Sequence, residues 1–154
     1  ESPIAKLETH KPLIKLSRLL KSDIEIPEVK GVYIAAIQIE NEEKHLEWWI
    51  CLINDQNIPI ENVIVNSRGY SDLETKKGKV TASLRKNIKV VSAKSAVRLE
   101  PIMPEVFELF NEYWVMFFED DIMKDRKYIF GPHTLDMRFS EDLPVLNTQG
   151  ILVR

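Results

Sequence analysis

The chain of 154 residues is poor in the residue types from which reactive centres are built. It has one cysteine, three histidines and five glycines. Zinc sites draw their ligands from several cysteines and histidines, and phosphate-binding loops need glycines close together. The glycines here stand far apart, at positions 31, 69, 78, 131 and 150. We therefore expect neither a bound metal nor a cofactor.

The single cysteine and the lack of long apolar runs bear on where the protein acts. Cys51 excludes an internal disulfide, so nothing in the sequence requires an oxidising compartment. No apolar run approaches the roughly 20 residues that span a bilayer, and no signal-peptide pattern opens the sequence. These features predict a cytoplasmic protein with no membrane span, in which Cys51 is buried and inert.

What the sequence has in abundance is the alternating pattern of β-strands. Residues 48–70 read as two strands joined by a polar turn, which is typical of antiparallel pairing. Residues 32–39 form an apolar run that suits a central strand. Residues 113–118 and 127–130 predict a second hairpin with an acidic loop. We predict one all-β domain over residues 23–154, an antiparallel immunoglobulin-like β-sandwich of about seven or eight strands.

Residues 1–22 differ from the rest and predict a short N-terminal amphipathic helix as a separate leader. Its leucines fall on one face and its basic residues largely on the other. Such a helix suits a membrane surface or a partner. We favour the simpler interpretations, in which the leucines pack on the sheet domain or the leader is only partly ordered. After the leader, Ile24 and Ile26 alternate with acidic residues in the manner of a strand.

Several stretches of the domain over 23–154 are similar to a family of small uncharacterised bacterial proteins. They are DIEIP (23–27), LIN and PIENVIV within 52–65, SRGY (67–70), EVFELFNEYWV (105–115), GPHT (131–134) and PVLNTQGILV (144–153). Some members carry an automatic label as the alpha subunit of phenylalanyl-tRNA synthetase. That enzyme needs a glycine-rich strand ending in arginine and a separate arginine–glutamate motif to hold ATP, and this sequence has neither. The resemblance therefore implies no activity and no site residues.

Charge is distributed unevenly, although the net charge is only −3. Residues 68–98 hold nine basic side chains against two acidic ones, and residues 100–125 hold eight acidic side chains against one basic one. Such a bipolar arrangement can steer a charged partner, match strands across the sandwich or join protomers. Nucleic acid is disfavoured, because Tyr70 is the only aromatic residue of the basic region on which a base could stack.

No combination of residues predicts catalysis. His10, His45 and His133 lie in polar or loop contexts, without the motif of a nucleophile or a zinc site. The acidic loop Glu119–Asp125 lacks the alternating ligands and central glycine of a calcium loop. The enzymatic alternative is a site formed only in three dimensions, from the acidic loop and His133.

The function that the sequence favours is a non-enzymatic module that binds a protein partner or a second copy of itself, for example through an exposed sheet edge. A weak nucleic-acid binder acting through residues 68–98 is a further alternative. Trp48 and Trp49 point to opposite faces of a strand, so one is core and the other is exposed or, as we prefer, packed beneath the N-terminal leucines. The predicted interaction surface comprises Trp49, Arg68, Tyr70, Lys76, Lys77, Arg85 and Lys86.

Overall fold

The computed structural model describes residues 28–76, 78 and 83–153. Within these residues the regular structure consists of nine β-strands and two short 3-10 turns, and the strands form two antiparallel sheets. The prediction of an all-β fold is therefore confirmed. The N-terminal helix predicted over residues 1–22 lies outside the described residues.

The first sheet has five strands in the order β5-β2-β1-β9-β8. Its centre is β1 (Val32–Glu40), which pairs with β2 (Leu46–Asn54) over its whole length. Beyond β2 lies β5 (Ser95–Ile102), and on the other side of β1 lie β9 (Gln149–Val153) and the two-residue β8 (Glu141–Asp142). The apolar run of β1 fits this central place, because the strand has neighbours on both sides and is largely buried on both faces.

The second sheet has four strands in the order β4-β3-β6-β7. They are β3 (Ile60–Tyr70), β4 (Leu84–Val91), β6 (Phe110–Glu119) and β7 (Ile122–Phe130). The predicted hairpin of β6 and β7 is confirmed by their continuous antiparallel register. Its two turn residues both have positive φ, 50° and 66°, the geometry that a tight turn between twisted strands requires.

The predicted pairing within residues 48–70 is wrong, because β2 and β3 belong to different sheets. The chain crosses between the sheets at residues 55–59, and the side chain of Asn54 holds this crossing in place. Its amide nitrogen donates to the carbonyls of Ile58, Val91 and Ser92 at 2.9, 3.2 and 3.1 Å. This satisfied buried amide ties the end of β2 to the end of β4, so each strand pairs with another neighbour.

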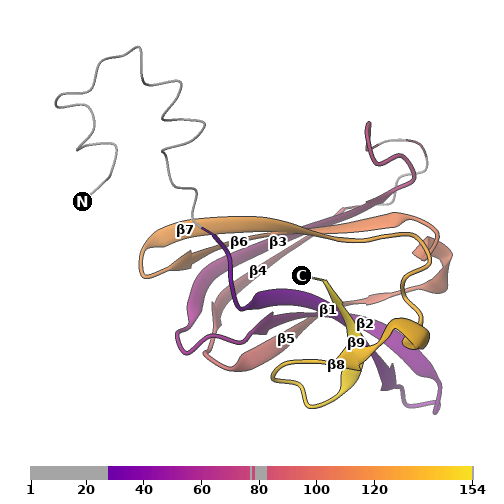
Figure 1. Ribbon diagram of the computed structural model, residues 1–154, viewed down its shortest axis with the longest axis horizontal. Helices are drawn as coiled ribbons and strands as arrows, with labels where there is room; N and C mark the ends of the chain where they lie inside the picture. The colour runs from indigo at the N-terminus through magenta and orange to yellow at the C-terminus, as the bar shows by residue number, and fades with distance from the viewer. Residues whose placement is uncertain (1–27, 77, 79–82, 154) are drawn as a thin grey trace.

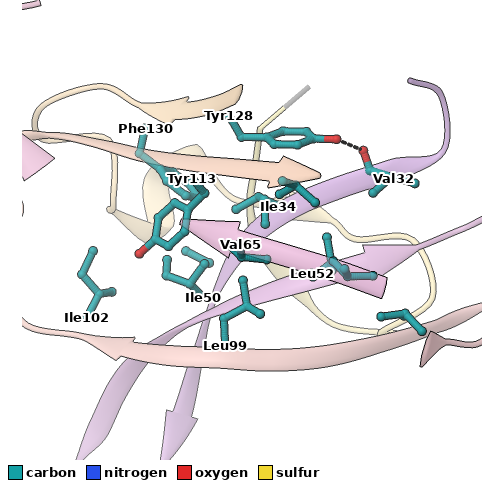
Figure 2. Packing of buried hydrophobic residues seen from close by; sticks show 14 of the residues in the cluster. Val32, Ile34, Ile50, Leu52, Val65, Leu99, Ile102, Tyr113, Tyr128 and Phe130 are labelled. Atoms are coloured by element: carbon teal, nitrogen blue, oxygen red, sulfur yellow. Dashed lines mark hydrogen bonds between the residues drawn. The ribbon is translucent and has the colours of Figure 1, made fainter. Parts of the chain in front are cut away.

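The two sheets pack face to face around one hydrophobic core (Figure 1). Ile34, Ile50 and Leu52 from the five-stranded sheet meet Val65 and Tyr113 from the other sheet (Figure 2). Burying such side chains is the main stabilising contribution, at about 1.5–3 kcal/mol for each large aliphatic residue.

Candidate functional site

The outer face of the five-stranded sheet is covered by the protein itself. Residues of β1 and β2 that alternate with the central core form a second buried cluster, in which Ala35, Ile37, Cys51 and Ile53 pack with Leu143 from the C-terminal segment. All five are at most 8% exposed. We call this surface the covered face. It behaves as a second core layer, so it offers little area to a partner.

Trp49 and Cys51 both lie in this covered layer. The indole N–H of Trp49 donates to Glu47 Oε1 at 3.1 Å, and the guanidinium of Arg98 lies 5.4 Å from the ring centroid. Burial raises the pKa of the Cys51 thiol to about 11, although Arg98 acts in the opposite direction. The thiol therefore stays protonated near neutral pH and is a poor nucleophile, as its place in the strand predicts.

The outer face of the four-stranded sheet has a different composition, which follows from strand register. Asn66 of β3 lies opposite Trp114 of β6, and Trp114 lies opposite Lys127 of β7. Residues opposite one another share a face, so the aromatic ring of Trp114 lies between the amide of Asn66 and the ammonium of Lys127 in one row across the sheet. We call this surface the open face. It comprises Ile64, Asn66, Arg68, Tyr70, Arg85, Glu112, Trp114, Met116, Phe118, Met123, Asp125 and Lys127.

One end of the open face is organised around a buried carboxylate, Glu112, which is 4% exposed. The hydroxyl of Tyr70 and the ammonium of Lys76 each donate to Glu112 Oε1 at 3.0 Å. Arg68 Nε lies 3.4 Å from Glu112 Oε2. The Tyr70 ring stacks on Phe110 with centroids 5.9 Å apart. These contacts tie the loop that carries Lys76 to the sheet.

The electrostatics of this cluster fix its protonation states. Burial alone raises the pKa of Glu112, but the bonds from Lys76 and Tyr70 and the charge of Arg68 outweigh it, and the pKa lies below its usual value. Burial, followed by the hydrogen bond to Glu112, raises the pKa of Tyr70 to about 12. At neutral pH the carboxylate is ionised and the phenol is neutral. The ionised carboxylate therefore holds Lys76, Tyr70 and Arg68 together at this end of the sheet.

Beside this cluster the open face has a depression of about 280 Å³. Trp114 lies in its wall, with Lys127 and Arg68 beside it. The indole N–H donates to Asp125 Oδ2 at 2.8 Å, and Lys127 Nζ lies 4.8 Å from the ring centroid. Further along β6 and β7 the face becomes apolar, since Phe118 and Met123 lie opposite each other and are 40% and 52% exposed.

The structure brings together some of the predicted interaction residues. Arg68, Tyr70 and Lys76 converge on Glu112, and Arg85 shares their face because it lies opposite Asn66 in the register of β3 and β4.

The other predicted residues lie elsewhere. Lys86 points between the sheets, where its ammonium donates to the Leu99 carbonyl at 3.1 Å. Trp49 lies on the covered face and Lys77 lies outside the described residues.

Three important members of the open face were missed by sequence reasoning, namely Glu112, Trp114 and Lys127. The signal for one pair was present, because the predicted hairpin of 113–118 with 127–130 already places Trp114 near Lys127. Glu112 gave no signal, since its partners Tyr70 and Lys76 are 42 and 36 residues away.

The acidic loop and His133 are not brought together. The loop runs into the start of β7 and His133 follows the end of that strand, so even Asp125 stands five strand residues before Phe130, roughly 17 Å at the usual rise of a strand. Within the described residues, no group of three or more histidine, cysteine or acidic side chains is placed to hold a metal ion. The part of the chain that the structure covers also has no helix long and apolar enough to cross a membrane.

Comparisons of the chain with protein-family models, with curated proteins and with solved structures give no match. The resemblance to the bacterial family therefore stays a prediction.

Proposed function

We propose that the protein is a non-enzymatic module that binds a protein partner with the open face of its four-stranded sheet. The observation that carries the proposal is the half-buried Trp114, set in a depression with Arg68 and Lys127 and continued by the exposed Phe118 and Met123. Aromatic residues, methionine and arginine are the residue types enriched at the centres of protein interfaces.

The surroundings of Trp114 favour binding because they hold the ring in place before a partner arrives. Asp125 accepts the indole N–H and Lys127 lies over the ring. A ring that is already ordered loses less conformational entropy on binding than a free one. The basic side chains Arg85 and Lys127 on the same face favour a partner with an acidic rim.

Binding through the face is better supported than self-association through a sheet edge. The two edge strands of the four-stranded sheet carry several basic residues, among them Lys89 on β4 and Lys124 on β7. Charged side chains on an edge, lysine above all, discourage pairing between identical chains.

We also propose that the fold is immunoglobulin-like and that the protein acts in the cytoplasm. The neighbours β1-β2-β5 and β3-β6-β7 correspond to the A-B-E and C-F-G strands of that fold, with β4 beside β3 and β9 beside β1 as additions. The buried free thiol of Cys51 supports a reducing compartment.

The test uses the full chain as bait in an extract of its source cells, followed by direct titration of each captured protein in purified form. Trp114→Ala is the test variant and Leu46→Ala is the matched control, because Leu46 is an exposed aliphatic residue of the other sheet. We expect Trp114→Ala to weaken binding by about thirtyfold or more, the loss typical of a central aromatic contact, and Leu46→Ala to leave it unchanged. A partner bound equally well by the Trp114→Ala variant would refute the proposal.

A second candidate function is favoured by one observation. Register places Trp114 beside Lys127 and near Arg68, so the structure supplies an aromatic platform among basic residues that residues 68–98 alone lack. Single-stranded nucleic acid would need this combination. However, Arg68 is already paired with Glu112 and Tyr70 is buried, which removes a cation and a ring from use. Titration with single-stranded oligonucleotides at two salt concentrations decides, because phosphate binding weakens as salt rises.

A further inference from the structure

A pocket of about 200 Å³ lies between the end of β5 and the start of β6. It is distinct from the depression on the open face, although Ser67 and Arg68 border both. The residues of β3 that point between the sheets become smaller towards this pocket. Val63 and Val65 pack in the core, whereas the next positions on the same side are Ser67 and Gly69. Side chains that would fill the space in a uniform core are therefore missing here.

A β-bulge turns one carboxylate towards this pocket. In the register of β2 and β5, Arg98 lies opposite Cys51 and Glu100 lies opposite Ile50, so Leu99 is an extra residue in β5. Simple alternation would place Glu100 on the outer side together with Arg98. The bulge instead places it opposite Ile50, which is 0% exposed in the core. Bulges re-aim side chains in this way and are common beside active sites.

The half-buried carboxylate of Glu100 has a neutral partner. The hydroxyl of Tyr113, which Figure 2 shows on the side of Ile102, donates to Glu100 Oε2 at 2.7 Å. Burial, and then the charge of Glu100, raise the pKa of Tyr113 well above its usual value, so the phenol stays protonated. Lys86 donates to the Leu99 carbonyl, and within the described part of the chain no cation forms an ion pair with Glu100. Its negative charge is therefore available to a ligand.

Two further polar groups of the pocket have unused hydrogen-bonding capacity. Ser67 is 7% exposed, and its hydroxyl makes no hydrogen bond with a described residue. The amide nitrogen of Asn111 donates to the carbonyls of Val106 and Leu109 at 3.0 and 3.2 Å, which leaves its amide oxygen for another donor. Among the described residues no sealed side-chain polar atom lacks a partner, so these two oxygens are open to the pocket.

The rest of the wall is largely apolar. Ile102, Met103 and Val106 line it, and Met103 stands at the rim with 49% exposure. Acceptors behind an apolar wall complement a long aliphatic stem that ends in a cation. A guanidinium group suits them best, because its five donors lie in one plane and it is weakly hydrated. Arg68 at the border opposes such a cation only weakly, since its own charge is paired with Glu112.

We propose that this pocket binds one arginine side chain of a protein partner, with the guanidinium on Glu100 and the aliphatic stem against Ile102 and Met103. The inference adds a second contact to the open face. It rests on the proposed function only in taking the arginine from a protein. A short peptide tests the pocket directly, whereas Trp114→Ala tests the open face, so either proposal can fail without the other.

The test titrates the full chain with the capped tripeptide acetyl-Gly-Arg-Gly-amide and follows the NMR shifts of the Ser67, Asn111 and Met103 amides. The neutral comparison is the same peptide with citrulline, which replaces the guanidinium with a urea of the same shape. We expect the arginine peptide to bind about tenfold more tightly or better, because hydrogen bonds between charged groups are the stronger ones. Equal affinity for the two peptides would overturn the proposal.

Variants locate the preference at the bulge. Glu100→Gln removes the charge but keeps an acceptor for the Tyr113 hydroxyl, and we expect it to abolish the preference for arginine over citrulline. The matched control is Glu105→Gln, the same change of charge at an exposed acid of the neighbouring 3-10 turn (Pro104–Val106), and the preference survives. Ser67→Val fills the pocket and prevents binding of both peptides. A preference that persists in Glu100→Gln, or unchanged binding by Ser67→Val, would refute the assignment.

Free arginine distinguishes a partner's side chain from a small-molecule ligand. We expect it to bind no more tightly than the capped peptide, because the contacts with Glu100 and the apolar wall use only the side chain. If free arginine binds more than about tenfold more tightly, the free amino acid is the ligand and the proposal of a protein partner at this pocket is wrong.

Discussion

The two outer faces of this sandwich are made by strands of the same kind, yet they have opposite properties. On the covered face several outward residues of β1 and β2 are small or aliphatic, as at Ala35, Cys51 and Ile53, and these three are almost fully buried, while the larger Trp49 packs against them. On the open face the outward residues of β6 are large and partly exposed, as at Trp114 and Phe118. The size and polarity of the outward side chains therefore match what lies over each sheet.

The C-terminal segment provides the cover for the first face, and one glycine allows it to approach closely. A side chain at Gly150 would place its Cβ 2.5 Å from the Ala36 carbonyl oxygen and 2.7 Å from Leu143 Cδ1. Only a residue without a Cβ fits between β1 and Leu143. A strand with apolar residues on both faces therefore needs a second layer, which its own chain provides here. The amphipathic aromatic outer face of β6 needs no such layer.

The largest contrast is expected between Ile53→Ala on the covered face and Phe118→Ala on the open face. Ile53 is 0% exposed, so truncation leaves a cavity and costs about 3 kcal/mol of the free energy of unfolding. Phe118 is 40% exposed and its truncation should cost under about 1 kcal/mol. Urea unfolding of both variants measures the difference. Equal losses would mean that the open face is also packed in solution.

The alternation of side chains along a strand was enough to predict that neighbouring residues lie on opposite faces of a sheet. Contacts between residues far apart in the sequence could not be predicted in this way. The opposite orientations of Trp48 and Trp49 were predictable, and Trp48 does lie in the core while Trp49 lies on the covered face. Arg85 and Lys86 were grouped as one basic surface, although the same alternation sends them to opposite sides of β4. The period of two that separates Trp48 from Trp49 separates Arg85 from Lys86 in the same way.

Which strands pair with one another could not be predicted from the sequence. The pattern of residues 48–70 resembles a hairpin, because local alternation does not distinguish a turn within one sheet from a crossing between two. Buried Asn54 stabilises the crossing between the sheets by donating to the carbonyls of residues 91 and 92, almost 40 residues away in the sequence. The site at Glu112 depends on the same kind of long-range register, so it could not be read from any short segment.

The second prediction concerns Glu112, the point at which the open face is as buried as the covered one. Glu112→Gln removes the charge that Lys76 and Arg68 share and leaves weaker acceptors, at a cost of about 2 kcal/mol. This is below the usual cost of breaking a buried pair, because both cations are partly exposed. Thermal or urea unfolding at neutral pH measures it, and Lys124→Gln, from another ion pair on β7, serves as the comparison.

The pH dependence of the free energy of unfolding tests whether the ionised form of Glu112 provides this stabilisation. Because the folded state holds the pKa of Glu112 below its usual value, the stabilisation is fully present above the unfolded pKa and is lost as the pH falls through the folded pKa. We expect the unaltered chain to lose its advantage over Glu112→Gln on acidification below about pH 4.5. A stability difference that stays constant down to strongly acidic pH would contradict the assignment of an ionised carboxylate.

The smallest effect is expected from Trp114→Phe on the open face, compared with Trp49→Phe on the covered face. Both indoles donate one hydrogen bond to a carboxylate and lie against one cation. The bond from Trp114 to Asp125 is exposed to solvent, so its loss should cost less than about 0.5 kcal/mol. Trp49 packs against the buried cluster of the covered face, and its replacement should cost about 1 kcal/mol or more because packing is lost as well. If Trp114→Phe proves the more destabilising of the two, the ring of Trp114 serves the fold rather than a partner.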